Sequence, residues 1–520
     1  DIEGAEVLIV SGSNTTEAHP VAALKIKKAV RFHGAKLIVI DPREIELVQY
    51  ATVWLRLKPG TNVALINGLL HVILKEGLEN KEFIQQRTEN IDMLRQVVAQ
   101  YTPEKVEEIT GVPKEDIINA ARIYAGTKKG MIVYGLGMTE HKAGSHGVMS
   151  LANLALITGN VGRPNTGINP LRGQNNVQGS CDMGALPDVY TGYQKVDDPA
   201  ANKKFSEAWG CQLPAKPGLK EPQMYREALS GKLKAMYIIG YDPAATQANI
   251  HHVQSAMKKL DLLVVQEIFM TETAKLAHVI LPAGCFFEKD GTFTNAERRV
   301  RMLNQAIPLP KGTKHDWEII CLIATAMGYP MHYNHPGEIM REIASLTPEF
   351  AGIDYERLEG DGLVWPVWDK KHPGTPILHK DTFTRGKGKF NDLLYTQSEE
   401  LPDSNYPLCL TTGRRLYHYN NGSMSLRNPE IHSISSEEFA EIHPNDAETH
   451  GIKTGDKVRV TSRRGTLEVR AQVTTKSRPG SVFLSFHFPE TPTNVLTGPG
   501  EDLLALTPEY KVCAVKVEKA

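Results

Sequence analysis

Residues 170–184, PLRGQNNVQGSCDMG, combine one arginine with glycines and side-chain amides. Segments that pack one face on a core repeat their apolar residues at a spacing of about 3.6 or 2.0 positions, and this segment shows neither spacing. Packing therefore gives no reason for Arg172. A planar guanidinium can offer a carboxylate two parallel hydrogen bonds, so Arg172 is a candidate for binding a small anion. The alternative is an ordinary surface loop, because connecting segments often have this composition.

Three glycine turns each follow an apolar run of strand length. Gly12 follows VLIVS, Gly135 follows MIVY and Gly240 follows MYII. A strand that ends in such a turn and opens a helix presents free backbone N–H groups and the positive end of a helix, which together suit a phosphate. Glycine is also common after strands for backbone reasons alone, so one turn is weak evidence. The repetition of the pattern favours nucleotide binding.

Further polar residues follow predicted strands. Asp41 lies at the tip of the second predicted strand, the apolar run that ends there, where a dinucleotide fold places a carboxylate that contacts ribose or base; a turn or helix-capping aspartate is the alternative. Residues 290–301, DGTFTNAERRVR, hold three arginines whose forked donors suit phosphate or pterin carbonyl groups, against the alternative of a solvated charged face. Residues 411–428 mix Gly, Arg, His and Asn, with a polar hairpin as the alternative.

The order of apolar runs and turns predicts the architecture that positions these residues. Strand, turn, helix and strand succeed one another over residues 5–44 and again over residues 234–267, so two βαβ units are expected. We predict a parallel-sheet, dinucleotide-binding α/β domain over residues 1–178, a second over 179–345, a connecting segment over 346–400 and a compact β-barrel over 401–520.

The amino-acid composition limits the classes of partner that the chain is expected to bind. The 520 residues include 59 Lys and Arg against 60 Asp and Glu, and a net charge of −1 favours neither nucleic acid nor a membrane surface. The apolar runs are all shorter than the roughly 18 residues that span a bilayer. The six cysteines contain no CxxC pair, so we expect free thiols in a reducing, cytoplasmic protein and no locally encoded metal site. The start, DIEGAEVLIV, carries no secretory signal, and the chain is equally compatible with a fragment whose beginning is missing.

Five segments together resemble the catalytic alpha subunit of the molybdopterin-dependent formate dehydrogenases, and the similarity runs through nearly the whole chain. These segments are LRGQNNVQGSCDMGALPD, TGNVGRPNTGINP, DGTFTNAERRVR, TGRRLYHYNNGSMS and HPNDAETHGIKTGDKVRVTSRRG. The resemblance implies a bis-molybdopterin guanine dinucleotide that holds molybdenum or tungsten. It also implies one dinucleotide on each α/β domain and a double-psi-like barrel that caps both.

The resemblance assigns residues to each part of the cofactor. One guanosine end is implied to contact Gly12, Ser13, Asn14, Asp41 and Arg43, with Gly135 and Gly137 near the same half. The other half is implied to contact Gly240, Asp242, Gln266, Thr271 and Thr273. The pterin and diphosphate channel is implied to include Asn295, Arg298, Gly413, Arg414, His418, His487, Asn494, Tyr510 and Lys511. Gln174 and Asn175 are expected to orient Arg172 or contact a pterin.

The implied reaction is the reversible oxidation of formate to carbon dioxide. Arg172 would bind formate, and electrons would pass to an iron–sulfur subunit, in turn linked to a hydrogenase or an NAD-linked diaphorase. His146 is a weaker candidate for handling protons, with a structural histidine as the alternative. Two other readings stay open: an oxygen-transfer enzyme of the nitrate reductase type, and a non-catalytic scaffold subunit that keeps the fold.

Two features of the resembled family are absent from the 520 residues. These are the cysteine cluster that binds a 4Fe-4S centre and the cysteine or selenocysteine that coordinates the metal; Cys181 is not its equivalent. We expect both in a segment that precedes Asp1 in the intact protein. The 520 residues alone are then expected to be inactive.

Overall fold

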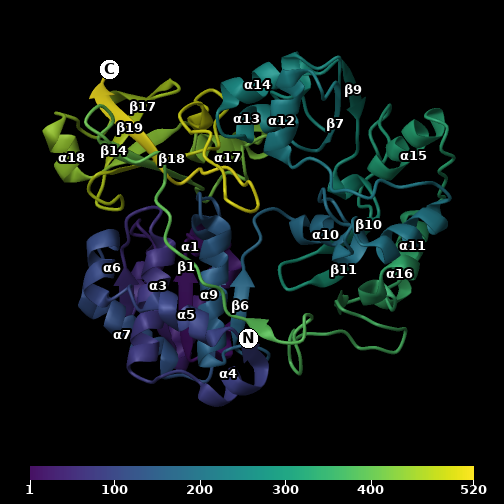
Figure 1. Cartoon of the computed structure of the whole chain (residues 1–520). Helices are drawn as coiled ribbons and strands as arrows, with labels where there is room; N and C mark the ends of the chain where they lie inside the picture. The colour runs from purple at the N-terminus through teal and green to yellow at the C-terminus, as the bar shows by residue number, and fades with distance from the viewer. The chain divides into compact units, whose positions relative to one another are not determined.

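The computed structural model describes all residues from 1 to 520 and divides into two compact units (Figure 1). The first unit comprises Asp1–Leu171, Ala245–Val253 and His379–Ala520. The second comprises Arg172–Ala244 and Gln254–Leu378. The predicted barrel segment thus shares a unit with the first predicted α/β segment.

A five-stranded parallel sheet forms the centre of the first unit. Its strand order is β3 (Val53–Leu55), β2 (Lys36–Ile40), β1 (Val7–Ser11), β5 (Gly130–Tyr134) and β6 (Gly167–Pro170). All five positions of β1 are buried, as expected for an apolar run at the centre of a sheet that is covered on both faces. The parallel sheet that the alternating strand and helix pattern predicts is confirmed here.

Successive residues of β1 enter different cores, because side chains alternate across a strand. Val7 and Ile9 join the core beneath α3 (Asn62–Lys75), α7 (Lys114–Ala125) and α9 (Gly144–Thr158). Leu8 and Val10 pack on α2 (Pro20–His33). The single helix predicted within residues 5–44 is two helices, α1 (Thr15–Ala18) and α2, because Pro20 cannot continue α1 and begins α2 instead.

Short elements complete this part of the chain. They are α4 (Lys81–Arg87), β4 (Thr88–Glu89), α5 (Ile91–Val98), α6 (Pro103–Thr110) and α8 (Leu136–Thr139).

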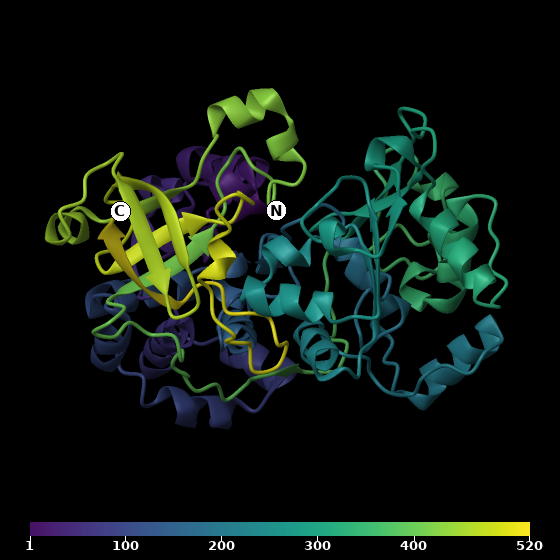
Figure 2. The same ribbon diagram turned by 90° about the horizontal axis from the view of Figure 1, so that it is seen from above.

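Six strands of the first unit close into a barrel. The order around it is β14 (Leu408–Gly413), β18 (Ser481–Ser485), β15 (Phe439–Ile442), β17 (Thr466–Val473), β16 (Lys457–Ser462) and β19 (Cys513–Lys519). Figure 2 shows these green-to-yellow strands wrapping around a common interior. Buried and exposed residues alternate along β16 and β17, which produces the period of two in the sequence. The predicted mixture of parallel α/β sheets and a C-terminal barrel is confirmed.

Two short helices lie outside the barrel wall, α17 (Pro429–Ile434) and α18 (Pro444–Thr449). The polar residues 411–428, for which a hairpin was the alternative, form the end of β14 and a loop instead.

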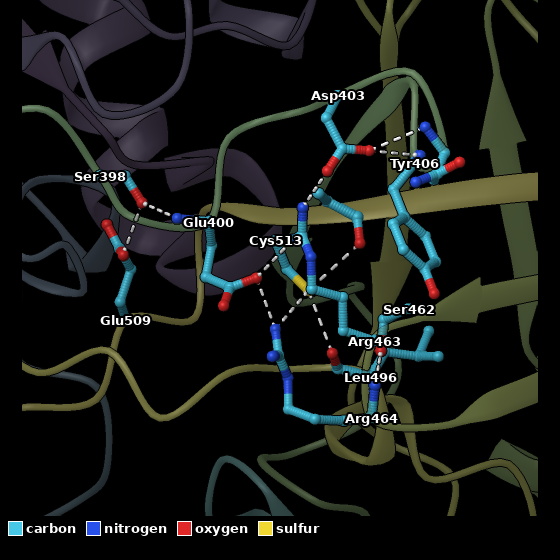
Figure 3. Close-up of polar contacts among 12 residues, drawn as sticks. Ser398, Glu400, Asp403, Tyr406, Ser462, Arg463, Arg464, Leu496, Glu509 and Cys513 are labelled. Atoms are coloured by element: carbon cyan, nitrogen blue, oxygen red, sulfur yellow. Dashed lines mark hydrogen bonds and ion pairs between the residues drawn. The ribbon is translucent and has the colours of Figure 1, made fainter.

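The segment before β14 is fastened to the barrel by ion pairs (Figure 3). Glu400 accepts from Arg463 Nη1 at 3.1 Å and Arg464 Nη2 at 2.5 Å, in the turn between β16 and β17. Ser398 Oγ donates to Glu509 Oε2 at 2.8 Å, and Glu509 Oε1 also accepts the Lys142 backbone N–H at 3.0 Å. These bonds fix the loop that leads into Tyr510 and Lys511.

The second unit contains two three-stranded sheets. The parallel one has the order β7 (Ala235–Ile239), β8 (Leu262–Glu267) and β9 (Val279–Pro282). The antiparallel one has β10 (Gly291–Thr294), β11 (Arg299–Leu303) and β12 (Leu363–Val364). The arginine-rich residues 290–301 are thus a hairpin.

The helices of the second unit are α10 (Val177–Asp182), α11 (Pro199–Trp209), α12 (Glu221–Ser230), α15 (Asp316–Ala326) and α16 (Pro336–Leu346). Two further helices, α13 (Pro243–Thr246) and α14 (Ile250–Lys258), include residues of both units. No helix of the chain has the length and apolar character needed to cross a bilayer.

Residues 346–400 were predicted to lack periodic structure, yet they contribute two short strands. β12 pairs with β11, and β13 (Gly388–Lys389) pairs with β4. A two-residue strand has no apolar period, so sequence pattern could not reveal either one.

Candidate functional site

The first unit contains a cavity at the carboxyl ends of β1, β2 and β5, beneath the end of barrel strand β14. It encloses about 920 Å³ not filled by protein atoms, part of it open to solvent. Ten of the predicted cofactor residues line it: Gly12, Ser13, Asn14, Asp41, Arg43, Gly135, Gly137, Gly413, Arg414 and Lys511. The carboxyl ends of parallel strands are the usual ligand-binding edge of such sheets.

The glycine turns allow two loops to approach each other closely. Gly12 has a φ of +56°, and a Cβ atom there would lie 2.5 Å from the carbonyl carbon of Gly137. The amide of Gly12 donates to Ile40, that of Gly135 to Ser11 and that of Gly137 to Gly12, while in the second unit Gly240 donates to Gln266. The amides of Gly12, Gly135 and Gly240 thus continue the strand hydrogen bonds and are not themselves free, while phosphate binding at these turns stays a prediction.

Asp41 is a buried carboxyl group at the edge of the cavity, with only 8% of its surface exposed. Its Oδ1 accepts the Arg43 backbone N–H at 2.9 Å. Burial raises its pKa to about 6, against the opposing effects of that hydrogen bond and of the Arg43 charge. The protein thus compensates the negative charge of Asp41 poorly, and its carboxylate is available to a hydrogen-bond donor in the cavity.

This raised pKa gives a pH prediction for the cofactor-free protein. The folded state binds the Asp41 proton more tightly than the unfolded state, so stability falls as pH rises between the ordinary pKa of 3.8 and about 6. This pH-dependent loss should disappear in Asp41→Asn. The difference between a pKa of 3.8 and one of about 6, at about 1.4 kcal/mol for each pKa unit, makes the loss at most about 3 kcal/mol in the free energy of unfolding. Urea unfolding at pH 4 and pH 7 measures it. The exposed Asp92→Asn on α5 is the control, and equal pH dependence in all three proteins would contradict the prediction.

Arg43 makes a paired contact with the barrel. Its Nε and Nη2 donate to the two carboxylate oxygens of Glu441 on β15, at 2.8 and 2.6 Å, and the guanidinium lies 3.9 Å from the centre of the Phe483 ring. Both charged side chains are nearly fully buried. Arg43 therefore joins the α/β sheet to the barrel as well as lining the cavity.

Arg414 Nε and His141 Nδ1 are buried polar atoms in the cavity wall, and neither has a hydrogen-bond partner in the protein. His141 Nε2 lies 2.9 Å from the carbonyl of Gly137 and burial lowers the pKa of the ring to about 4, so the neutral ring donates there and Nδ1 is an acceptor. A bound group with both an acceptor and a donor would satisfy the two atoms. A nucleotide with phosphate, hydroxyl and base amine groups fits this requirement.

Lys511 enters the cavity from the residues before β19. Its Nζ donates to Thr412 O at 2.9 Å and lies 2.7 Å from Glu140 Oε2. The lysine is thus oriented by a neighbouring carboxylate while adding positive charge to the cavity wall.

Four predicted residues of the barrel part do not line this cavity and instead hold loops together. His418 Nε2 lies 2.6 Å from Ser435 O, and His487 Nε2 accepts the Arg415 backbone N–H at 2.8 Å. Asn494 Nδ2 and Tyr510 OH both donate to Thr246 O, at 2.7 and 3.2 Å. Their contacts with a cofactor remain a proposal.

In the second unit, the predicted residues gather at the carboxyl ends of β7 and β8. Asp242 Oδ1 accepts from Thr273 N at 2.8 Å and Thr273 Oγ1 at 2.7 Å, and Gln266 Nε2 donates to Asp316 Oδ1 at 2.6 Å. Gly240 has a φ of +59° and open space where a Cβ would lie. Thr271 caps the following turn, where its Oγ1 accepts the Ala274 N–H at 3.2 Å. This edge is the counterpart, within its own unit, of the edge around Gly12.

The turn of the β10–β11 hairpin carries Asn295 and Arg298. The Arg298 guanidinium donates to the carbonyl oxygens of Trp365, Thr375 and Pro376, so it binds a neighbouring loop. Asn295 Oδ1 accepts the N–H groups of Glu297 and Arg299 within the turn. The forked donors of Arg298, which were predicted to bind a phosphate or a pterin carbonyl group, thus bind protein carbonyl groups.

Arg172 lies in the loop between β6 and α10, and its Nε donates to Gln178 Oε1 at 2.9 Å. Gln174 and Asn175 precede α10, and the carbonyl of Gln174 accepts the Val177 N–H at 3.4 Å. His146 lies on α9 in the first unit with its Nδ1 buried and unpaired. The chain contains no group of three or more His, Cys, Asp or Glu side chains placed to hold a metal ion.

Sequence reasoning missed His141, which lines the first-unit cavity, and two residues that pair with lining side chains: Glu140, which pairs with Lys511, and Glu441, which pairs with Arg43. Glu441 carries a usable signal, because it is a charged residue in the otherwise buried strand FAEI. The pair Glu140 and His141 follows a glycine turn as other polar site residues do, but no spacing rule distinguishes it from a solvated loop.

Comparison with known proteins identifies the family. The model named Molybdopterin oxidoreductase matches residues 1–326, and the molybdopterin dinucleotide binding domain matches residues 408–514. The chain is 48% identical to the F420-dependent formate dehydrogenase subunit alpha of Methanocaldococcus jannaschii and 41% identical to formate dehydrogenase H of Escherichia coli. All of this chain is covered in both cases, with 77% and 73% of the respective relatives.

A solved structure supports the fold alone. Acetylene hydratase from Pelobacter acetylenicus matches with a TM-score of 0.78 at 18% sequence identity, over all of this chain and 78% of that one. The chain therefore belongs to the molybdopterin oxidoreductase family.

Proposed function

We propose that the chain is the catalytic part of a formate dehydrogenase and that Arg172 binds formate. The observation that carries the proposal is Arg172 itself, whose guanidinium is held by the buried side chain of Gln178 in a segment without an apolar period. The relatives at 41% to 48% identity that are named formate dehydrogenases support the choice of substrate. A very small anion offers little apolar area, so charge-assisted hydrogen bonds must supply its binding energy.

The first-unit cavity would hold one guanine dinucleotide. Asp41 would accept hydrogen bonds from the base or ribose, while Arg414 and Lys511 would face the phosphates and His141 Nδ1 would accept from a cofactor donor. The second dinucleotide would lie against Gly240, Asp242, Gln266, Thr271 and Thr273. When bound, the molybdenum or tungsten centre supplies the two-electron chemistry.

The chain's own residues would bind and orient the substrate. Arg172 pairs with the formate carboxylate and so directs the C–H bond away from the guanidinium. Gln174 and Asn175 would contact the pterin beside it. Electrons would leave through a 4Fe-4S centre to an iron–sulfur subunit.

The test uses the full-length protein with its partner subunits. We expect formate-dependent reduction of a viologen dye or of coenzyme F420, release of ¹³CO₂ from ¹³C-formate, and two molecules of guanosine monophosphate per chain after acid hydrolysis. A metal-loaded protein that fails to oxidise formate would refute the proposal. Oxidation of reduced dye by nitrate instead would favour an oxygen-transfer enzyme.

Asp41→Ala should lower the content of bound dinucleotide. Loss of a charged hydrogen-bond partner costs about 1.5–3 kcal/mol, enough to weaken binding roughly tenfold or more. Guanosine monophosphate released per folded chain measures the effect, and Asp92→Ala on the exposed face of α5 is the matched control. Full occupancy in Asp41→Ala would exclude Asp41 as a cofactor contact.

A further inference from the structure

The helix that follows the Arg172 loop turns two buried polar side chains to the same side. Gln178 and Asp182 are four residues apart on α10, so they are neighbours on one face of the helix. Only 7% of Gln178 and none of Asp182 is exposed. Amide and carboxylate groups are rarely buried at such a level without a specific hydrogen-bonding role.

These side chains form a directed chain of hydrogen bonds that starts at Arg172. Arg172 Nε donates to Gln178 Oε1 at 2.9 Å, and Gln178 Nε2 donates to Asp182 Oδ1 at 2.7 Å. The guanidinium has only donors and an ionised carboxylate has only acceptors. The amide therefore has one possible orientation, with its oxygen toward Arg172 and its nitrogen toward Asp182.

Two aromatic side chains fix the far end of the chain. Tyr193 OH donates to Asp182 Oδ1 at 2.8 Å, and Trp365 Nε1 donates to Asp182 Oδ2 at 2.8 Å. Burial raises the pKa of Asp182, whereas these donors and the Arg172 charge act to lower it. The carboxylate is thus held by three side-chain donors, and its negative charge lies near the guanidinium.

The contact at Nε decides how Arg172 can meet an anion. An arginine can bind a carboxylate side-on, through Nε and one Nη, or end-on, through both Nη atoms. Nε carries a single hydrogen, and Gln178 accepts it. A side-on pair through Nε is therefore not available to a carboxylate while this contact is kept, and the contact fixes the guanidinium plane.

We propose that Gln178 and Asp182 are positioning residues that fix the guanidinium plane of Arg172, so that formate meets an arginine ordered in advance. The inference rests on the proposed function of Arg172. Ordering the arginine before binding removes an entropic cost that a mobile side chain would incur on each encounter. The effect should therefore fall on formate binding and little on the redox step.

The test is a double-mutant cycle in the full-length holoenzyme. Gln178→Leu removes the acceptor at Nε, and we expect a roughly tenfold higher KM for formate with kcat changed less than about threefold. Dissociation constants from ¹³C-formate line broadening, in enzyme reduced with dithionite to prevent turnover, should rise by a similar factor. Ser180→Ala, on the exposed side of the same helix, is the control and should change neither constant. Asp182→Asn should show the same pattern as Gln178→Leu, more weakly.

The effect of Gln178→Leu in an Arg172→Lys background distinguishes the positioning of Arg172 from a purely structural role of Gln178. Lysine has no Nε–H fork for Gln178 to orient, so Gln178→Leu should have little further effect on KM in the Arg172→Lys background. Equal effects in both backgrounds, or an unchanged KM in Gln178→Leu, would overturn the inference while leaving the proposed function intact. Unchanged formate kinetics in Arg172→Ala would instead refute the proposed function.

Discussion

Arg172→Ala is expected to lower kcat/KM for formate by tenfold to a hundredfold or more. Removing a charged hydrogen-bond partner costs about 1.5–3 kcal/mol, and more where the anion is left partly desolvated. The variant should keep its metal and both dinucleotides, because the cofactor contacts proposed for this loop come from Gln174, Asn175 and the backbone and not from Arg172. The change thus separates substrate binding from cofactor binding.

Arg172→Lys refines the same expectation. Lysine restores the charge but presents a single ammonium in place of a planar fork, so activity should be partly retained with weaker formate saturation. Steady-state oxidation with a dye acceptor, normalised to bound metal, measures both variants. Kinetics equal to those of the parent in Arg172→Ala would show that this arginine has no contact with the substrate.

The fold was largely predictable because its signals are local. The run VLIV of β1 is apolar throughout, as a central parallel strand must be, and the alternation in KVRVTS and TLEVRAQV reports barrel strands with one buried face. The two-residue strands β12 and β13 carry no such period. Their pairing depends on contacts with β11 and β4, which are distant in sequence.

The site was predictable where residues follow strand ends and less so where side chains pair over long distances. Asp41, Gly12 and Gly135 follow directly from the pattern of strands and turns, and the structure places them around one cavity, whereas Gly240 lies in the second unit. The hydrogen bonds of Arg298 and His487 depend on loops far along the chain, so sequence pattern could not show that these side chains are engaged by the protein. Glu441, which pairs with Arg43 across 398 residues, was missed for the same reason.

Glu441→Gln should cause the largest loss of stability among the changes considered. It removes the charge that balances buried Arg43, whose side chain is 9% exposed against 4% for Glu441. Breaking a buried ion pair by removing one partner costs about 3–5 kcal/mol, because the remaining charge stays buried without compensation. The free energy of unfolding of the first unit should fall by this amount, since the pair joins its sheet to its barrel.

A matched control and a rescue distinguish this ion pair from a general effect of altering a barrel strand. Glu468→Gln changes a glutamate on neighbouring strand β17 that pairs with Lys457 and Arg459 at the surface, where water screens the charges, so little loss is expected. Arg43→Met combined with Glu441→Leu replaces both charges with apolar groups and should recover much of the stability lost in Glu441→Gln, because no uncompensated charge remains. Urea unfolding of the cofactor-free protein measures the stability of the two single variants and of the double variant. If the Glu441→Gln protein is no less stable than the Glu468→Gln protein, the buried pair does not hold the barrel on the sheet, and Arg43 is then available to a ligand in the cavity.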